Sequence, residues 1–337
     1  MSHAVILGGT GTIGRAAARR LLAAGWDVTA VGRDPSRMPD DVAAAGARFA
    51  AADRFEPGEL AAAVGAGADL LVDCLCFTAA HARDLVPLLA DVGSTVMIST
   101  KAVYVDDAGN HVNSDDTPDF GGPVDESRPT MAPREDVDHL SRDGYGANKV
   151  AAERVLLDSG HPVTVLRPSR VHGDGTAKPD EWVFVKRILD RRAVVFLAHG
   201  GRGVDQTSAA ANIASLIETV ARRPGSRILN SADPDAPSAL EISRTVAAHL
   251  GHEWREVLLD PHAPAWLGLH PWHRIPPIRL DTGAAMRLGY RPAGDYATTV
   301  ATELDWLTTA PLPPGFDHEY FAPMLDYDAE DAYLATR

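Results

Sequence analysis

The first two-thirds of the chain alternates between short apolar runs and segments in which apolar residues recur at helical spacing. The apolar runs predict strands at residues 4–9, 27–33, 47–53, 68–77, 94–100 and 162–168. The helical spacing predicts helices at 12–25, from about 57, at 79–91 and at 144–160. Alternation of this kind predicts βαβ units, and therefore an α/β protein with a Rossmann-type doubly wound parallel sheet.

The pattern changes twice along the chain. Residues 106–140 are rich in Asp, Pro, Gly and Asn and predict a long loop. After Arg167 the alternation loosens, and irregular stretches separate predicted helices at about 180–191, 208–223, 237–250 and 295–309. We therefore expect two parts. A dinucleotide-binding Rossmann domain covers 1–167 plus about 205–232, and a smaller substrate-binding lobe covers 168–204 and 233–337. The acidic tail at 317–337 is expected to be a surface segment.

Composition narrows the function classes. The chain has 337 residues, of which 45 % are hydrophobic, and its formal net charge is 32 − 46 = −14. An acidic chain without a Lys/Arg block is a poor candidate for binding nucleic acid. No apolar run approaches the roughly 18 residues of a membrane span, and the N-terminus predicts a strand rather than a signal peptide. Cys74 and Cys76 are expected to be buried thiols without a disulfide, which fits a cytoplasmic location.

The sequence GGTGTIG follows the first predicted strand and opens the first predicted helix. Its glycines permit a tight turn, a close approach of a pyrophosphate and close packing of helix on strand, and the helix N-terminus attracts phosphate. A plain strand–helix turn is the alternative, but the βαβ context favours dinucleotide binding. The cofactor-binding candidates here are Gly8, Gly9, Thr10, Gly11, Thr12, Ile13 and Gly14, and Cys74 near the end of the strand at 68–77 is a further candidate.

The second predicted strand ends in VGRD. An acidic residue usually binds the ribose 2′-hydroxyl of NAD at this point, whereas an arginine suits the 2′-phosphate of NADP. Because Arg33 occupies the position, we expect NADP(H) to be favoured, with NAD(H) possible. In the alternative, Arg33 is a surface residue and Asp34 binds the ribose. Asp53, after the third strand, is a candidate partner for the adenine amino group.

A phenol and an ammonium group share one helical face. Tyr145 and Lys149 lie at positions i and i+4 of the predicted helix at 144–160. A neighbouring lysine favours the phenolate, so the phenol can exchange a proton, and the same lysine can bind a nicotinamide ribose. The pair gains weight from Thr100, because strand ends are where doubly wound sheets bind ligands.

Four motifs, GGTGTIG, STKAVY, YGANK and RPSRVHG, occur in an order and spacing that resemble the extended short-chain dehydrogenase/reductases of the epimerase/dehydratase family. The resemblance covers roughly residues 3–230. It implies that Thr100 orients the substrate oxygen, that Tyr145 is the catalytic acid/base, and that Lys149 holds the ribose and tunes the tyrosine. It also implies that Pro168 and Ser169 border the nicotinamide.

The resemblance also suggests contacts to the substrate. His172 is a substrate-binding candidate, because it stands where the family commonly has a tyrosine. Thr100 and Lys101 are also candidates for contact with the substrate. In sugar-nucleotide 4,6-dehydratases an acidic pair follows the threonine, but this chain has Lys101 and Ala102. One hypothesis makes Lys101 a catalytic base beside a transient ketone. The alternative is a lysine bound to an acidic loop or to a substrate phosphate.

The proline-broken stretch 261–277 gathers three histidines and two tryptophans. An aromatic pocket for a sugar or base would include Trp272, and simple packing of the lobe is the alternative. We expect no metal site, because nothing in this spacing makes the ligands converge.

The family resemblance implies an NAD(P)-dependent enzyme that acts on a small molecule, namely a sugar, sugar nucleotide or nucleoside, through a transient ketone. The rivals are an NADPH-dependent carbonyl reductase or alcohol dehydrogenase and a non-catalytic NADP-sensing protein. The alanine-rich face of 147–153 is compatible with a homodimer, or is simply good helix sequence.

Overall fold

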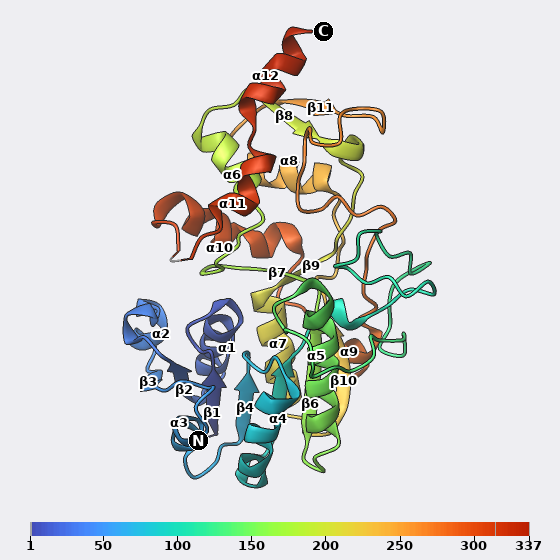
Figure 1. Cartoon of the computed structure of the whole chain (residues 1–337). Coiled ribbons are helices and arrows are strands. Elements are labelled where there is room, and N and C mark those ends of the chain that lie inside the picture. Colours follow the sequence, from blue (N-terminus) through green and yellow to red (C-terminus); the bar gives the residue numbers. More distant parts are fainter. Residues whose placement is uncertain (1, 314, 337) are drawn as a thin grey trace.

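A computed structural model describes residues 2–313 and 315–336. It has two parts, a parallel sheet flanked by helices and a smaller lobe beyond the carboxyl ends of the strands (Figure 1). The N-terminus lies in the sheet part, and the C-terminus lies at the far end of the lobe. Within the described residues, no helix combines the length and apolar character needed to cross a membrane.

The sheet has seven strands in the order β10-β6-β5-β4-β1-β2-β3, and every neighbouring pair is parallel. This order reverses direction beside β1, as in doubly wound folds, and places a crevice at the carboxyl ends of β1 and β4. The strands are β1 His3–Leu7, β2 Asp27–Gly32, β3 Arg48–Ala51, β4 Leu70–Asp73, β5 Thr95–Ile98, β6 Val163–Pro168 and β10 Arg227–Ser231. The predicted fold class is confirmed.

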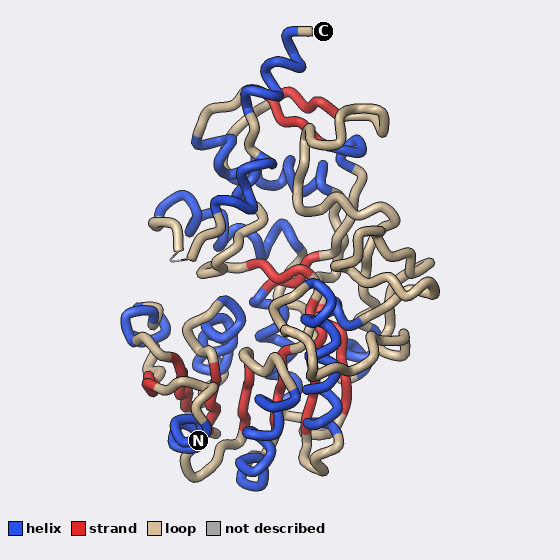
Figure 2. The backbone as a smooth tube through the Cα atoms, viewed as in Figure 1, coloured by secondary structure: helices blue, strands red, loops and turns tan. Residues whose placement is uncertain are grey.

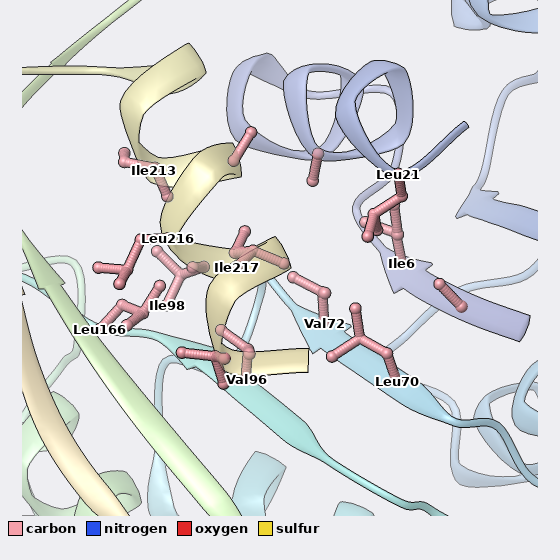
Figure 3. Close-up of a cluster of buried hydrophobic side chains, with 14 of the residues drawn as sticks. Ile6, Leu21, Leu70, Val72, Val96, Ile98, Leu166, Ile213, Leu216 and Ile217 are labelled. Atoms are coloured by element: carbon pink, nitrogen blue, oxygen red, sulfur yellow. The ribbon is translucent and has the colours of Figure 1, made fainter. Parts of the chain in front are cut away.

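Helices cover both faces of the sheet because its strands are apolar on both sides. Ile6, Val72 and Val96 pack with α1 and α7 on one face (Figure 3), while Leu7 and Met97 pack with the helices of the other face. The covering helices are α1 Thr12–Ala23, α2 Asp40–Ala44 and α7 Ala210–Ala221 on the first face, and α3 Pro57–Val64, α4 Ala79–Leu85 and α5 Arg142–Leu157 on the second.

The lobe has its own hydrophobic core, centred on Phe184, Trp272 and Tyr296. The short parallel pair of β7 with β9 lies at the junction with the sheet part, and the pair of β8 with β11 lies at the far end of the lobe (Figure 1). The elements of the lobe and its junction are β7 Arg170–His172, α6 Trp182–Leu189, β8 Val194–Leu197, β9 Thr207–Ala209, α8 Ala239–His249, β11 Arg255–Leu258, α10 Tyr296–Thr309, α11 His318–Phe321 and α12 Tyr327–Ala335. Helix α9, Gly283–Arg287, falls within the predicted lobe range 233–337 but packs beside β10 in the core of the sheet part.

Several predicted boundaries needed correction. The strand predicted at 68–77 ends at Asp73, because the Leu75 N–H turns back to the Asp73 carboxylate at 2.8 Å. The tail at 317–337 is not merely a surface segment. Phe321 is buried in the lobe core, and Glu330 forms a buried ion pair with Arg187. The loop at 106–140 is confirmed, and Figure 2 shows it beside the junction of the two parts.

Candidate functional site

The glycine-rich turn between β1 and α1 has the packing that the motif predicted. Gly8 has a positive φ of 80°, which favours glycine. A Cβ on Gly14 would overlap the Gly8 carbonyl oxygen, and a Cβ on Gly9 would lie 2.7 Å from Ala30 Cα. The helix begins after Gly11, and its first turn has no side-chain cap and no acidic residue. The N-terminus of α1 is therefore free to bind an anion.

A cavity of about 460 Å³ opens beside this turn. Of the seven cofactor-binding candidates in the turn, Gly8, Thr10 and Gly11 line the cavity, while Gly9, Thr12, Ile13 and Gly14 form the rest of the turn and the start of α1. The other lining residues come from the carboxyl ends of β2, β3 and β4 and are Val31, Gly32, Arg33, Asp34, Arg37, Ala52, Asp53, Arg54, Phe55, Leu75 and Phe77. A glycine cradle beside a cavity of this size fits the phosphates and the adenosine end of a dinucleotide.

Two guanidinium groups lie at the end of β2, where the cofactor specificity was predicted. The Arg33 side chain is 75 % exposed and its Nη1 lies 3.9 Å from Asp53 Oδ2. Asp34 instead accepts hydrogen bonds from Ser36 N and Ser36 Oγ at 2.9 and 2.7 Å, which lower the pKa of its carboxyl. Arg33 and Arg37 can therefore face the cavity as cations while Asp34 is engaged with Ser36.

A buried ion pair that no sequence motif indicated holds Arg54, one of the residues that line the cavity. Arg54 Nε and Nη2 donate to Asp73 Oδ2 at 3.1 and 2.6 Å, and both side chains are buried. Arg54 Nη2 also donates to the His81 carbonyl. The signal for this pair was a charged residue at the carboxyl end of each of two strands.

Ser99, the first residue of the STKAVY motif, anchors the tyrosine-bearing helix α5. Ser99 Oγ donates to Glu153 Oε1 of α5 at 2.5 Å, and Arg167 of β6 donates to both Glu153 oxygens at 3.0 and 2.5 Å. All three side chains are buried. Successive strand residues point to opposite sides, so Thr100 points away from the side on which Ser99 binds Glu153. This network fixes α5 against the sheet.

Helix α5 lies against the 3₁₀ turn Lys101–Val103 at the end of β5. A Cβ on Gly146 would lie 2.5 Å from the Ala102 carbonyl oxygen, so only glycine permits this approach. The neighbouring Tyr145 side chain packs against the small cluster formed by Ala102, Val112 and Ile278. The phenol is thereby held beside the residues that follow Thr100.

Lys149 reaches the carboxyl edge of the sheet from α5. Its Nζ donates to the carbonyls of Cys76 and Ile98 at 2.8 and 2.9 Å and lies 4.4 Å from the centre of the Phe77 ring. Phe77 lines the cavity beside the glycine-rich turn, which we call the dinucleotide cavity, so the ammonium group lies at the edge of that cavity. An ammonium has three N–H donors, and the two described bonds leave one for a ligand.

Thr100 Oγ accepts a hydrogen bond from Ala102 N at 3.1 Å and keeps its own O–H to donate. The structure thus brings Thr100, Tyr145 and Lys149 to the carboxyl edge of the sheet, the same edge at which the glycine-rich turn follows β1. Their catalytic roles stay predictions.

Lys101 is buried in an ion pair between the two parts of the protein. Its Nζ donates to Asp205 and, at 3.0 Å, to Ser169 Oγ. Burial opposes ionisation of Asp205, but Lys101 and Arg170 lower the pKa of Asp205 to about 2. Burial lowers the pKa of Lys101, and Asp205 opposes that shift. These contacts favour the alternative in which Lys101 binds an acidic group rather than acting as a base. The acidic group is the Asp205 carboxylate and not the loop at 106–140.

The remaining predicted residues divide into two groups. Pro168 ends β6, and Cys74 lies beside the glycine-rich turn, where burial raises the pKa of its thiol to about 12. Ser169 binds Lys101 and the Gln206 carbonyl, so its hydroxyl is engaged at the junction.

Two predicted substrate contacts are core residues instead. Trp272 is 0 % exposed and stacks on Phe184 with ring centres 5.8 Å apart. The simple lobe-packing alternative describes it, since no surface is left for a ligand. His172 is also buried and binds Asp233 at 3.0 Å. No local pattern pointed to that partner, which lies far along the chain.

Comparison with known proteins agrees with this geometry. A family model described as NAD(P)H-binding matches residues 8–185, which is more than half of the chain. The chain belongs to this NAD(P)H-binding family. No curated protein matches its sequence. The predicted NAD(P)-binding domain is confirmed at the level of family and fold.

Solved structures share the fold at low sequence identity. UDP-glucose 4-epimerase from Stenotrophomonas maltophila, solved with bound NAD and formylated UDP-arabinopyranose, has a TM-score of 0.69 and 17 % identity over 91 % of this chain and 98 % of its own. UDP-N-acetylglucosamine 4-epimerase from Bacillus cereus has a TM-score of 0.67 and 15 % sequence identity, and the match covers 92 % of this chain and 100 % of that protein. dTDP-glucose 4,6-dehydratase from Bacillus anthracis, in complex with NAD, has a TM-score of 0.66 and 14 % sequence identity, and the match covers 96 % of this chain and 100 % of that protein.

Proposed function

We propose that this chain is an NAD(P)-dependent enzyme of the epimerase and dehydratase kind, acting on a sugar, sugar nucleotide or nucleoside through a transient ketone. The observation that carries the proposal is the joint placement of Thr100, Tyr145 and Lys149 at the carboxyl edge of the sheet, the same edge at which the glycine-rich turn follows β1. The similarity of fold to sugar-nucleotide epimerases and a dehydratase supports the substrate class.

The bound dinucleotide would supply a hydride acceptor that later returns the hydride. Tyr145 takes the proton of the substrate hydroxyl and gives it back when the ketone is reduced. The Thr100 hydroxyl donates to the substrate oxygen and orients it. Lys149, held by the carbonyls of Cys76 and Ile98, uses its remaining N–H for the ribose and stabilises the phenolate by its charge.

We also propose that NADP(H) is favoured over NAD(H). The support is that Arg33 and Arg37 line the cavity where a 2′-phosphate would lie, while Asp34 is held by Ser36. An exposed guanidinium can bind such a phosphate through two parallel hydrogen bonds. The predicted homodimer stays a prediction.

The first experiment measures the cofactor content of the purified protein. The protein is denatured, and released nucleotide is identified by chromatography and absorbance. Near-stoichiometric oxidised cofactor would support a closed redox cycle, as an epimerase or dehydratase needs. An empty protein that binds NADPH reversibly would instead support the carbonyl reductase, and it would overturn the leading proposal.

The second experiment tests the chemistry with two substrates that the related structures name. UDP-glucose and dTDP-glucose are incubated with the wild type, and the sugar products are analysed by NMR. We expect conversion of at least one, and a loss of about 10²-fold or more in Tyr145→Phe. Tyr327→Phe is the matched control, because its hydroxyl binds Asp190 in the lobe. A biological effect that survives in Tyr145→Phe, without turnover in the wild type, would support the sensor alternative.

A further inference from the structure

A second cluster of chemical groups lies at the junction of the sheet part and the lobe, outside the proposed active site. His172 ends β7, Glu181 immediately precedes α6, and Glu303 lies on α10. Figure 1 shows β7, α6 and α10 on the lobe side of the junction. The exposed fractions of the three residues are 3 %, 1 % and 0 %. Each can offer one nitrogen or oxygen atom such that all three atoms lie within 4.8 Å of one another.

Each of the three side chains has one atom held by a hydrogen bond and one atom left unpaired. His172 Nε2 binds Asp233 Oδ2 at 3.0 Å, Glu181 Oε1 accepts from the Tyr296 hydroxyl at 3.0 Å, and Glu303 Oε2 accepts from Gly173 N at 2.5 Å. The opposite atoms, His172 Nδ1, Glu181 Oε2 and Glu303 Oε1, are buried and have no hydrogen-bond partner among the residues that the structure describes.

Buried atoms of this kind need a partner, because an unpaired buried polar group costs about 1–3 kcal/mol and an unpaired charge costs more. Burial raises the pKa of both Glu181 and Glu303; repulsion by Asp180 adds to the rise for Glu181, and repulsion by Glu181 adds to the rise for Glu303. One shared proton could join these two carboxylates. Such a shared proton would still leave His172 Nδ1 without a partner, because Glu303 Oε2 lies 3.9 Å from that nitrogen, which is too far for a hydrogen bond. A divalent cation would satisfy all three atoms together.

The surroundings also resemble those of a metal ligand set. When a carboxylate accepts the proton of one imidazole nitrogen, the other nitrogen keeps the lone pair that binds metal. Asp233 is placed to do this for His172, and Asp233 is in turn held by Thr207, Ala209 N and Asn212. One imidazole and two carboxylates are donors typical of zinc and its first-row neighbours. The His172 end of the cluster borders a cavity of about 470 Å³, which His172 and Gly173 help to line.

We propose that His172, Glu181 and Glu303 bind one divalent first-row cation, zinc by their donor set, which ties β7, α6 and α10 together. The two carboxylates balance the charge of the ion. The site is distinct from the proposed catalytic residues, and its ligands come from distant parts of the sequence, which is why the sequence analysis expected no metal.

The test measures metal bound to the full chain, purified without metal-chelating resin. The protein is given one equivalent of Zn²⁺, dialysed against metal-free buffer and analysed by mass spectrometry of the elements. We expect one ion per wild-type chain and none in His172→Gln or Glu303→Gln. His249→Gln is the matched control, because His249 is a partly exposed histidine paired with Asp305, and it should keep the ion.

A milder variant tests the outer shell of the site. Tyr296→Phe keeps the ring that packs on His172 and removes the hydroxyl that orients Glu181. We expect zinc affinity to fall by about 10–100-fold in a chelator competition. An affinity equal to that of the wild type would contradict the assignment of Glu181.

The proposal stays testable if the ligand variants do not fold, because the wild type alone can be loaded with Co²⁺. A visible d–d absorption band and a rise in melting temperature with Zn²⁺ would support the site. No band, no retained zinc and an unchanged melting temperature would overturn it, and the carboxylates would then share a proton. These readouts do not depend on cofactor or substrate, so they fail or succeed separately from the proposed function.

Discussion

Glu153 offers the sharpest test of what holds α5 in place. It accepts hydrogen bonds from Ser99 Oγ at 2.5 Å and from Arg167 at 3.0 and 2.5 Å, and its side chain is 2 % exposed. Glu153→Ala leaves the Arg167 guanidinium buried without its counter-ion. Removing one partner of a buried pair costs about 3–5 kcal/mol, much of it from the stranded charge.

The expected shift in melting temperature follows from chain length. An unfolding entropy of about 2.1 cal/mol/K per residue gives about 0.7 kcal/mol/K for 337 residues, so the loss corresponds to about 4–7 °C. Differential scanning calorimetry and urea unfolding would measure it. The matched control is Glu256→Ala, which breaks an ion pair of the same type with the exposed Arg244 and should cost much less.

A double variant separates the stranded charge from the loss of packing. In Glu153→Met with Arg167→Met both charges are gone, and the new thioether side chain at position 167 still lies over the apolar face of Tyr104, which the Arg167 guanidinium covers at 4.8 Å in the wild type. We expect the double variant to recover most of the stability lost in Glu153→Ala. The reasoning is refuted if Glu153→Ala and Glu256→Ala cost the same, or if the double variant is the least stable of the set.

Three further outcomes are expected. Gly14→Ala should abolish cofactor binding measured by calorimetry, because its Cβ overlaps the Gly8 carbonyl, whereas Gly58→Ala, with open space in α3, should bind normally. Arg33→Ala should weaken NADPH binding by about 10–150-fold, the value of a hydrogen bond to a charged group, and leave NADH unchanged; equal losses for both would exclude a 2′-phosphate contact. Burial lowers the pKa of His270 from 6.5 to about 4. The neutral ring therefore stabilises the fold fully above pH 6.5, and about 3 kcal/mol is lost by pH 4, a loss that urea unfolding should not find in His270→Gln.

The sequence predicted the sheet part well because its signals are local. Apolar runs, glycine stops and the Gly8–Gly14 turn each act within a few residues, and the i, i+4 spacing put Tyr145 and Lys149 on one face of α5. The strand–helix alternation then determined where the carboxyl ends of the strands meet. The residues lining the dinucleotide cavity follow from that arrangement.

The lobe junction could not be predicted in the same way, because its contacts join residues that are far apart in sequence. Lys101 pairs with Asp205 across 104 positions, and His172 pairs with Asp233 across 61. A lysine or histidine beside a strand end looks the same in sequence whether it faces substrate or a buried carboxylate. Trp272 illustrates the same limit, since only the packing on Phe184 distinguishes a core ring from a pocket wall.

The position of Lys101 bears on which reaction the proposed active site can serve. Loss of water next to a transient ketone needs a base for the neighbouring C–H, and Lys101 is the candidate that follows Thr100. To act, it must release Asp205 and Ser169, and Asp205 would remain buried beside Arg170 with one cation fewer. Epimerisation and simple reduction need only the proton exchanged by Tyr145 and the hydride. The ion pair therefore favours these reactions over dehydration.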